Sequence, residues 1–181
     1  MVAGSAERWV VLSYRIPRTP STPRIAIWRK LRSLGVAQMG DGLVALPEDA
    51  RTREQLEWVA DDVEAAHGSA LLWRAELLSS RDEQRLVAQL LDARAEEYRD
   101  ILRRARAGQS DPTVTGVTGR LQGRLLGQLR RELRRIRRRD YFPPPEAELA
   151  RRAVEELADA HGPKQGSGAA AGRAGMRVER V

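Results

Sequence analysis

The chain has 181 residues, contains no cysteine and has few aromatic side chains. Without cysteine it cannot form disulfide bonds, thiolate metal sites or a cysteine nucleophile. Aromatic residues make up only 4% of the sequence, so a mostly aliphatic core is expected. No apolar run approaches the roughly 20 residues of a membrane-spanning helix, and the first residues lack the apolar core of a signal peptide. These absences predict a soluble, cytoplasmic protein that does not engage a membrane.

Catalytic and metal-binding patterns are also absent from the sequence. The two histidines, His67 and His161, are far apart and have no metal-ligand partners at suitable spacing. The sequence has no glycine-rich phosphate loop and no nucleophile motif. We therefore expect a protein that is not an enzyme, with no catalytic residues, no cofactor and no metal site.

Charge is distributed in three blocks along the chain. Residues 8–40 contain seven basic residues and no acid, and residues 48–100 contain fourteen acids and seven arginines. Residues 101–140 contain twelve arginines and three acids, and the whole chain has a net charge of +7. Such asymmetry predicts an anionic partner such as nucleic acid, an internal pairing of the acidic and basic blocks, or both.

Hydrophobic periodicity predicts a βαββαβ order over residues 9–78. An alternating strand over 9–16 is followed by prolines and by an amphipathic helix that ends near Leu34. Two short apolar runs flank Gly40-Asp41-Gly42, which is a hairpin signal, and a helix over 50–67 precedes a strand over 69–78. This order is that of the ferredoxin-like split βαβ. We expect antiparallel strands with the first and third at the centre and both helices on one face.

The two faces of this sheet receive different predictions. The first helix is expected to bury Trp28 together with Ile27 and Leu31 against one face. The other face would be left without a helix from residues 9–78; it bears Trp9, Val11, either Leu43 or Val44, and either Trp73 or Leu72. An uncovered apolar face implies a partner, either the C-terminal half of the chain or a second copy.

Helical spacing dominates the second half of the chain. Apolar positions indicate helices over about 80–107, 119–140 and 145–161, the first two forming a hairpin. Residues 1–8 and 162–181 have the composition of a disordered start and a disordered tail. The expected fold class is therefore α+β, with a ferredoxin-like βαββαβ domain over 9–78 followed by an α-helical C-terminal extension over 80–161.

The first candidate site is the basic turn and helix near the N-terminus. Its cations are Arg15, Arg18, Arg24, Arg29, Lys30 and Arg32. We expect these side chains to bind nucleic-acid phosphates, because the whole segment lacks acids. The same segment could also hold a small oxyanion. Thr22 is predicted as the N-cap of the helix, and together with Arg24 it would form this oxyanion site, since helix N-termini favour anions. The alternative is a solvated helix face.

The second candidate site is the arginine-rich stretch over residues 130–140. In a helix, Leu133 and Ile136 face the core, and the arginines surround the rest: Arg130, Arg131, Arg134, Arg135, Arg137 and Arg138. Nucleic-acid phosphates can neutralise them. The acids of the preceding helix, Asp92, Glu96, Glu97 and Asp100, can also do so in an antiparallel hairpin. Few aromatic residues lie between the cations, which argues against stacking of single-stranded bases.

Several short motifs, taken in order, resemble the N-terminal domain of the ChrB family, a group of bacterial chromate-resistance regulators. The motifs are Tyr14-Arg15-Ile16-Pro17, Ser21, Arg24, Trp28-Arg29-Lys30-Leu31, Leu34-Gly35, Asp41-Gly42, Leu46-Pro47, Trp58 and the block from Arg137 to Phe142. The domain is also similar to part of the phenylacetate-degradation repressor PaaX. It is more distantly similar to the small nuclease-like subunit of CRISPR adaptation complexes.

The resemblance implies a DNA-binding transcriptional regulator of a chromate or other oxyanion resistance operon. The implied partners are double-stranded DNA and a second copy, bound through the open sheet face or the helical hairpin. Full-length family members carry a further C-terminal domain, so a separate sensor-domain protein is another expected partner. One alternative is a protein that docks such a sensor chain without binding DNA. Another is a ferredoxin-like nuclease, although Ser13-Tyr14-Arg15 stands where the nuclease relatives place a metal-binding aspartate.

Overall fold

The computed structural model describes residues 8–109 and 117–160, with side chains described from residue 121 onward in the second range. The predicted disordered start up to residue 7, the predicted tail over 162–181 and His161 lie outside the described residues. The elements in chain order are β1 (Trp9–Arg15), α1 (Ser21–Leu34), β2 (Ala37–Gly40), β3 (Leu43–Pro47), α2 (Ala50–Ala65), β4 (Ser69–Ala75), α3 (Ser80–Gln109), α4 (Val117–Arg137) and α5 (Pro145–Asp159).

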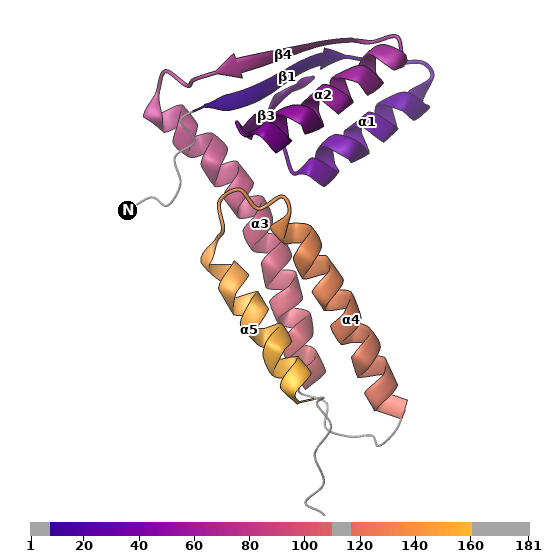
Figure 1. Cartoon of the computed structure of the whole chain (residues 1–181), viewed down its shortest axis with the longest axis vertical. Coiled ribbons are helices and arrows are strands. Elements are labelled where there is room, and N and C mark those ends of the chain that lie inside the picture. Colours follow the sequence, from indigo (N-terminus) through magenta and orange to yellow (C-terminus); the bar gives the residue numbers. More distant parts are fainter. Residues whose placement is uncertain (1–7, 110–116, 161–181) are drawn as a thin grey trace, which may run out of the picture.

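The strands form an antiparallel sheet in the order β2-β3-β1-β4. The predicted βαββαβ order and the central positions of the first and third strands are therefore confirmed (Figure 1). The turn between β2 and β3 requires glycine, because Gly42 has a φ of 69°. A Cβ atom at this position would also overlap the carbonyl oxygen of Tyr14.

Helices α1 and α2 cover one face of the sheet (Figure 1). Their apolar stripes pack on alternate residues of the two central strands, in a buried cluster of Val10, Leu12, Ile27, Leu31, Val44, Leu46, Leu56, Val59 and Val63. The prediction that Trp28 belongs to this core is wrong, because its side chain is 53% exposed. The stripe of α1 follows Ile27, Leu31 and Leu34, and Trp28 lies about 100° around the helix from Ile27.

The second face of the sheet is covered at one end by the C-terminal half of the chain. Trp9 and Val11 are buried there against the start of α3 and against Phe142, whose ring centroid lies 6.5 Å from that of Trp9. Leu71 and Trp73 on β4 share this face, since they pair with Ser13 and Val11, but they remain 59% and 54% exposed. The C-terminal half of the chain, one of the two partners predicted for this face, therefore covers part of it, and the rest of the face is open.

The three C-terminal helices pack around their own apolar core. Tyr98 and Ile101 of α3 meet Leu129 and Ile136 of α4 and Leu157 of α5 in this cluster. Leu121 of α4 and Leu149 of α5 lie outside this core and are 58% and 46% exposed. Helix α3 joins both cores, because its first turns pack on the sheet and its later turns form the centre of the bundle (Figure 1). Within the described ranges, no helix has the length and apolar content needed to cross a membrane.

Candidate nucleic-acid interface

The buried stripe of α1 leaves most of its cations facing solvent. Arg24, Arg29 and Arg32 are exposed, and none pairs with an acid within residues 8–109 and 121–160. Lys30 is different, because its Nζ lies 2.5 Å from Asp62 Oδ2 on α2. Its charge is therefore neutralised inside the fold, and the helix presents arginines to solvent.

Helix α4 also turns its predicted arginines outward. Leu125, Leu129, Leu133 and Ile136 lie toward the bundle core, and this stripe fixes the orientation of the helix. The predicted set on this segment is exposed throughout and forms no ion pair with any described acid: Arg130, Arg131, Arg134, Arg135, Arg137 and Arg138. Nucleic-acid contact by these arginines stays a prediction, but their side chains are free to make it.

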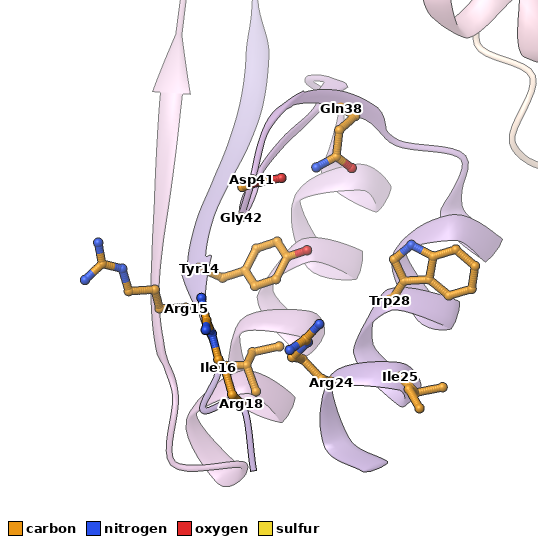
Figure 2. Close-up of a pocket in the computed structure, with 10 residues that line it drawn as sticks. All are labelled: Tyr14, Arg15, Ile16, Arg18, Arg24, Ile25, Trp28, Gln38, Asp41 and Gly42. Atoms are coloured by element: carbon orange, nitrogen blue, oxygen red, sulfur yellow. The ribbon is translucent and has the colours of Figure 1, made fainter. Parts of the chain in front are cut away.

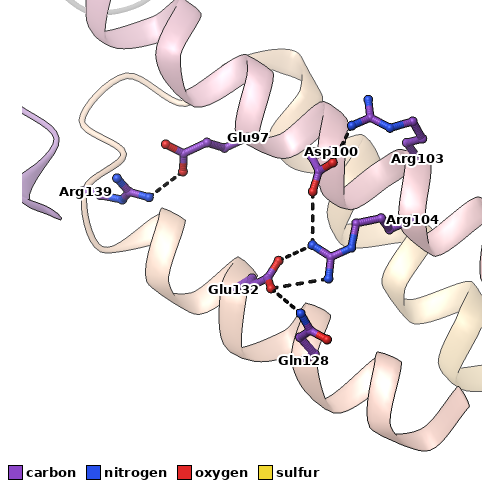
Figure 3. Close-up of polar contacts among 7 residues, drawn as sticks. All are labelled: Glu97, Asp100, Arg103, Arg104, Gln128, Glu132 and Arg139. Atoms are coloured by element: carbon purple, nitrogen blue, oxygen red, sulfur yellow. Dashed lines mark hydrogen bonds and ion pairs between the residues drawn. The ribbon is translucent and has the colours of Figure 1, made fainter. Parts of the chain in front are cut away.

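The predicted pairing of the acidic and basic helices is limited to their contact line (Figure 3). Glu97 accepts a hydrogen bond of 2.7 Å from Arg139 Nη2, and Glu132 of α4 accepts one of 2.6 Å from Arg104 Nη1. Asp100 instead binds arginines of its own helix, at positions 103 and 104. Glu96 likewise pairs with Arg99 on the same helix. The internal neutralisation therefore does not reach the exposed arginines of α4.

The two basic segments, more than one hundred residues apart in the chain, meet at one pocket. A cavity of about 390 Å³ is lined by Arg29 and Arg32 from α1, by Arg135 and Arg139, and by Trp28 and Ser33. We call it the four-arginine pocket; none of its lining residues is acidic. Burial lowers the pKa of Arg139, Glu97 opposes this effect, and the nearby charges of Arg94, Arg135 and Arg32 lower the pKa further. This mutual repulsion favours an anion in the pocket.

Trp28 also lines a second cavity, of about 900 Å³ (Figure 2). Three predicted cations line it, Arg15, Arg18 and Arg24, together with Tyr14, Ile16, Ile25, Gln38, Asp41 and Gly42. Figure 2 shows the hydroxyl of Tyr14 pointing across the cavity toward the indole of Trp28. Burial, and then the charge of Asp41, raise the pKa of Tyr14. Its hydroxyl is therefore protonated at neutral pH and can donate a hydrogen bond into this cavity. We call it the Tyr14 cavity.

The start of α1 differs from the prediction. The N-cap is Pro20, in extended geometry, and it makes no side-chain cap hydrogen bond. Thr22 is not the N-cap but an exposed residue of the first turn. The fixed φ of Pro20 already supplies the extended backbone that an N-cap needs, so the helix begins before Thr22. The predicted oxyanion site loses its capping hydroxyl, and Arg24 belongs to the Tyr14 cavity.

A cluster of buried polar groups holds α1 against the helical extension. Arg94 of α3 is 6% exposed and lies 3.2 Å from Glu97, which also binds Arg139. Arg139 Nη1 donates to the carbonyl of Arg32 at 3.4 Å, and the hydroxyl of Tyr141 donates to the carbonyl of Leu34 at 3.2 Å. These bonds satisfy carbonyls at the C-terminal end of α1 and keep the two basic segments adjacent.

Two functional features were missed by reasoning from the sequence. One is the exposure of Trp28, which its position outside the helical stripe could have indicated. The other is the burial of Arg94. Its ion-pair partner Glu97 lies three residues along the same helix, but Gly35 and Arg139, which lie against this pair, come from distant parts of the chain. Among the described residues, no group of three or more His, Cys, Asp or Glu side chains is placed to hold a metal ion.

Comparison with known proteins gives a result for the first half of the chain. Residues 24–109, from α1 to the end of α3, match the family model described as Protein ChrB, N-terminal. Protein ChrB of Cupriavidus metallidurans is 29% identical over 90 residues, which cover 50% of this chain and 27% of that protein. The aligned stretch thus spans about a quarter of the relative's length. No solved structure matches the chain. Residues 24–109 of this chain, which carry most of α1, the strands β2–β4, α2 and α3, are therefore similar to the N-terminal part of ChrB proteins.

Proposed function

We propose that this chain is a DNA-binding regulatory protein of a chromate-resistance system. The family relation supports a link to the regulation of chromate resistance. The observation that carries DNA binding is the convergence of the exposed arginines of α1 and α4 on one pocket. Three of the arginines that line it, Arg29, Arg32 and Arg135, form no ion pair with a described acid, and phosphates would supply the missing counter-charge.

The proposed contact is to the phosphate backbone of double-stranded DNA. Arginine forms two parallel hydrogen bonds to a phosphate, so a row of exposed arginines can position a duplex without reading its sequence. Helix α4 presents such a row from Arg130 to Arg137, over roughly 10 Å of helix, and Arg138 follows its end. The cations beside the Tyr14 cavity extend the basic surface onto the sheet domain. The protein acts as a binder and not as an enzyme in this proposal.

The fold and assembly in this proposal follow from the sheet. The strand order matches that of the ferredoxin-like split βαβ, and we assign the chain to that fold class. The open part of the second sheet face, with Leu71 and Trp73 on the edge strand β4, is the proposed contact to a second copy. The same observation favours a second candidate function, in which the chain docks a separate sensor-domain protein through this face and binds no DNA.

Duplex binding and its salt dependence test the proposed function. We expect a labelled duplex from the region upstream of the gene to bind with an affinity that falls steeply between about 50 and 200 mM salt. Arg131→Gln and Arg135→Gln should each weaken binding across sequences and reduce the slope of log affinity against log salt by about 1. Fluorescence anisotropy measures both quantities.

The matched control is Arg152→Gln on α5, whose guanidinium is exposed but hydrogen-bonded to Glu148 at 2.8 Å. This variant should bind the duplex as the wild type does. An equal loss in the control, or an affinity that does not respond to salt, would contradict an arginine–phosphate interface. A folded wild-type protein that binds no duplex at about 50 mM salt would favour the docking function instead.

A further inference from the structure

Trp28 is a large apolar side chain exposed in the middle of a cationic surface. Its indole is 53% exposed and lines both the four-arginine pocket and the Tyr14 cavity. The guanidinium carbon of Arg32 lies 5.1 Å from the ring centroid, which is a cation–π contact. The ring is thus held in place from one side while much of its surface remains in water.

The two cavities beside Trp28 differ in chemistry. The four-arginine pocket has no acidic lining residue and suits a phosphate. The Tyr14 cavity adds a hydroxyl donor and the carboxylate of Asp41 to its arginines, and these groups can pair with the edge of a heterocycle. Gln38 Nε2 already donates to the carbonyl of Gly40 at 2.6 Å, which leaves its side-chain oxygen as an acceptor. The carboxylate of Asp41 also repels a phosphate, so the two cavities are suited to different parts of one ligand.

We propose that Trp28 stacks on an unpaired nucleobase whose adjacent phosphate occupies the four-arginine pocket. The inference rests on the proposed function, since it specifies what the DNA-binding surface prefers. A base inside an intact duplex is already stacked and cannot cover the indole. The ligand is therefore a nucleotide with a free base, which a single-stranded overhang or a free mononucleotide can supply. Base stacking on an aromatic side chain changes affinity by roughly fivefold to a hundredfold.

The test compares three labelled or titrated ligands: a blunt duplex, the same duplex with a short single-stranded overhang, and a nucleoside monophosphate. We expect the overhang to increase the affinity of the wild type roughly tenfold over the blunt duplex. Trp28→Ala should remove that gain, so that the ratio of overhang affinity to blunt-duplex affinity falls to about one. Trp28→Phe should keep part of the gain, because phenylalanine still stacks.

Trp58→Ala is the matched control, because Trp58 is also 53% exposed but lies on α2 and lines neither cavity. It should retain the full preference for the overhang. Binding of the mononucleotide that depends on Trp28, without any overhang preference, would assign the site to a free nucleotide. Equal affinities of the wild type and Trp28→Ala for all three ligands would overturn the proposal, as would an equal loss on the blunt and overhang duplexes.

The outcomes separate this inference from the proposed function. If the wild type binds the overhang and not the blunt duplex, and Trp28→Ala removes that binding, the stacking site stands and the duplex-binding function fails. If the blunt duplex binds, the overhang adds nothing and the mononucleotide does not bind, the regulator stands and the stacking site fails. Because Trp28 is exposed, its replacement should not unfold the protein, and circular dichroism of each variant checks this.

Discussion

At the scale of single residues, the geometry of the site depends on Gly35. This residue ends α1 with a φ of 72° in the left-handed region. A Cβ atom there would overlap the guanidinium of Arg94, which is buried beside Glu97. Gly35 therefore permits both the helix end and the close approach of α3.

We expect Gly35→Ala to lower the free energy of unfolding by about 2 kcal/mol, because a left-handed alanine and a displaced buried guanidinium each cost about 1 kcal/mol or more. Urea denaturation measures the change. Gly40→Ala is the control: no atom lies within 4 Å of its added Cβ, so its stability should change by less than about 0.5 kcal/mol. An equal, small effect of both substitutions would show that Arg94 moves aside freely.

Single residues were also where prediction from the sequence was weakest. Trp28 was assigned to the core because it is large and apolar, yet Ile27 and Leu31 already define the buried stripe. Arg94 could not be assigned to a buried position, because a pair with Glu97 at i,i+3 is typical of a helix surface, and the residues that lie against it, Gly35 and Arg139, are distant in sequence. The apolar residue type led to the wrong prediction for Trp28, and the tertiary packing, which the sequence does not show locally, buries Arg94.

At the scale of elements, the buried face of α4 could be predicted from the sequence, but the partners of its charged residues could not. The leucine spacing correctly predicted the face that packs on α3 and α5, apart from the exposed Leu121. Whether the arginines of α4 pair with the acids of α3 could not be predicted. Both groups of charges recur at helical spacing, so the sequence does not say which of them face each other. The rotation of the helices decides this, and among the side chains that the structure describes it brings Glu132 and Arg139 into charge pairs with α3.

The contact between α3 and α4 should respond to acid through Glu132. Partial burial alone would raise the pKa of Glu132, but hydrogen bonds from Arg104 and Gln128, and the charges of Arg104 and Arg135, bring it below its ordinary value. A carboxyl group with a lowered pKa in the folded state stabilises the fold above its unfolded pKa, and this contribution is lost as the pH falls through the folded pKa.

We therefore expect the wild type to lose more stability than Glu132→Gln between about pH 6 and pH 3. Urea unfolding of both proteins at several pH values measures the difference. Glu57→Gln, which removes a surface pair with Arg53, should follow the wild type. A wild-type curve parallel to that of Glu132→Gln would mean that the pair with Arg104 contributes nothing to folding.

At the scale of the whole molecule, Phe142 connects the sheet to the helical extension. It lies between α4 and α5, is 8% exposed and packs against Trp9 and the first turns of α3. We expect Phe142→Ala to destabilise the protein by about 3 kcal/mol through loss of buried ring contacts. Tryptophan fluorescence and far-UV circular dichroism should report one shared transition at a lower urea concentration.

Leu149→Ala on α5 is the comparison, because this leucine is 46% exposed and its truncation should cost less than about 1 kcal/mol. Two separate transitions in the wild type would show instead that the sheet and the helical extension unfold independently. The same result would remove the reason to expect a fixed arrangement of the two basic segments.

The overall architecture was more predictable than the site. Alternation, turn residues and helical spacing are local signals, so the βαββαβ order and the position of α1 and α2 on one face could be predicted. For the sheet face opposite α1 and α2, the sequence left two possible covers, the C-terminal half of the chain or a second copy. The four-arginine pocket could not be predicted, because Arg32 and Arg135 meet only through the packing of α3 against the sheet.

Because the arginines of α4 from residue 130 to 137 form no ion pair with a described acid, ionic strength should have opposite effects on the stability of the protein and on its affinity for phosphates. Salt screens the repulsion among them and so favours the folded chain, whereas the same screening weakens their attraction for phosphates. If the protein binds DNA as proposed, the bound DNA would relieve this repulsion as salt does. The complex would then add most to the free energy of unfolding at low salt, where the free protein is least stable. Purification in high salt would then yield a stable protein from which nucleic acid has been removed. Low salt would favour the complex.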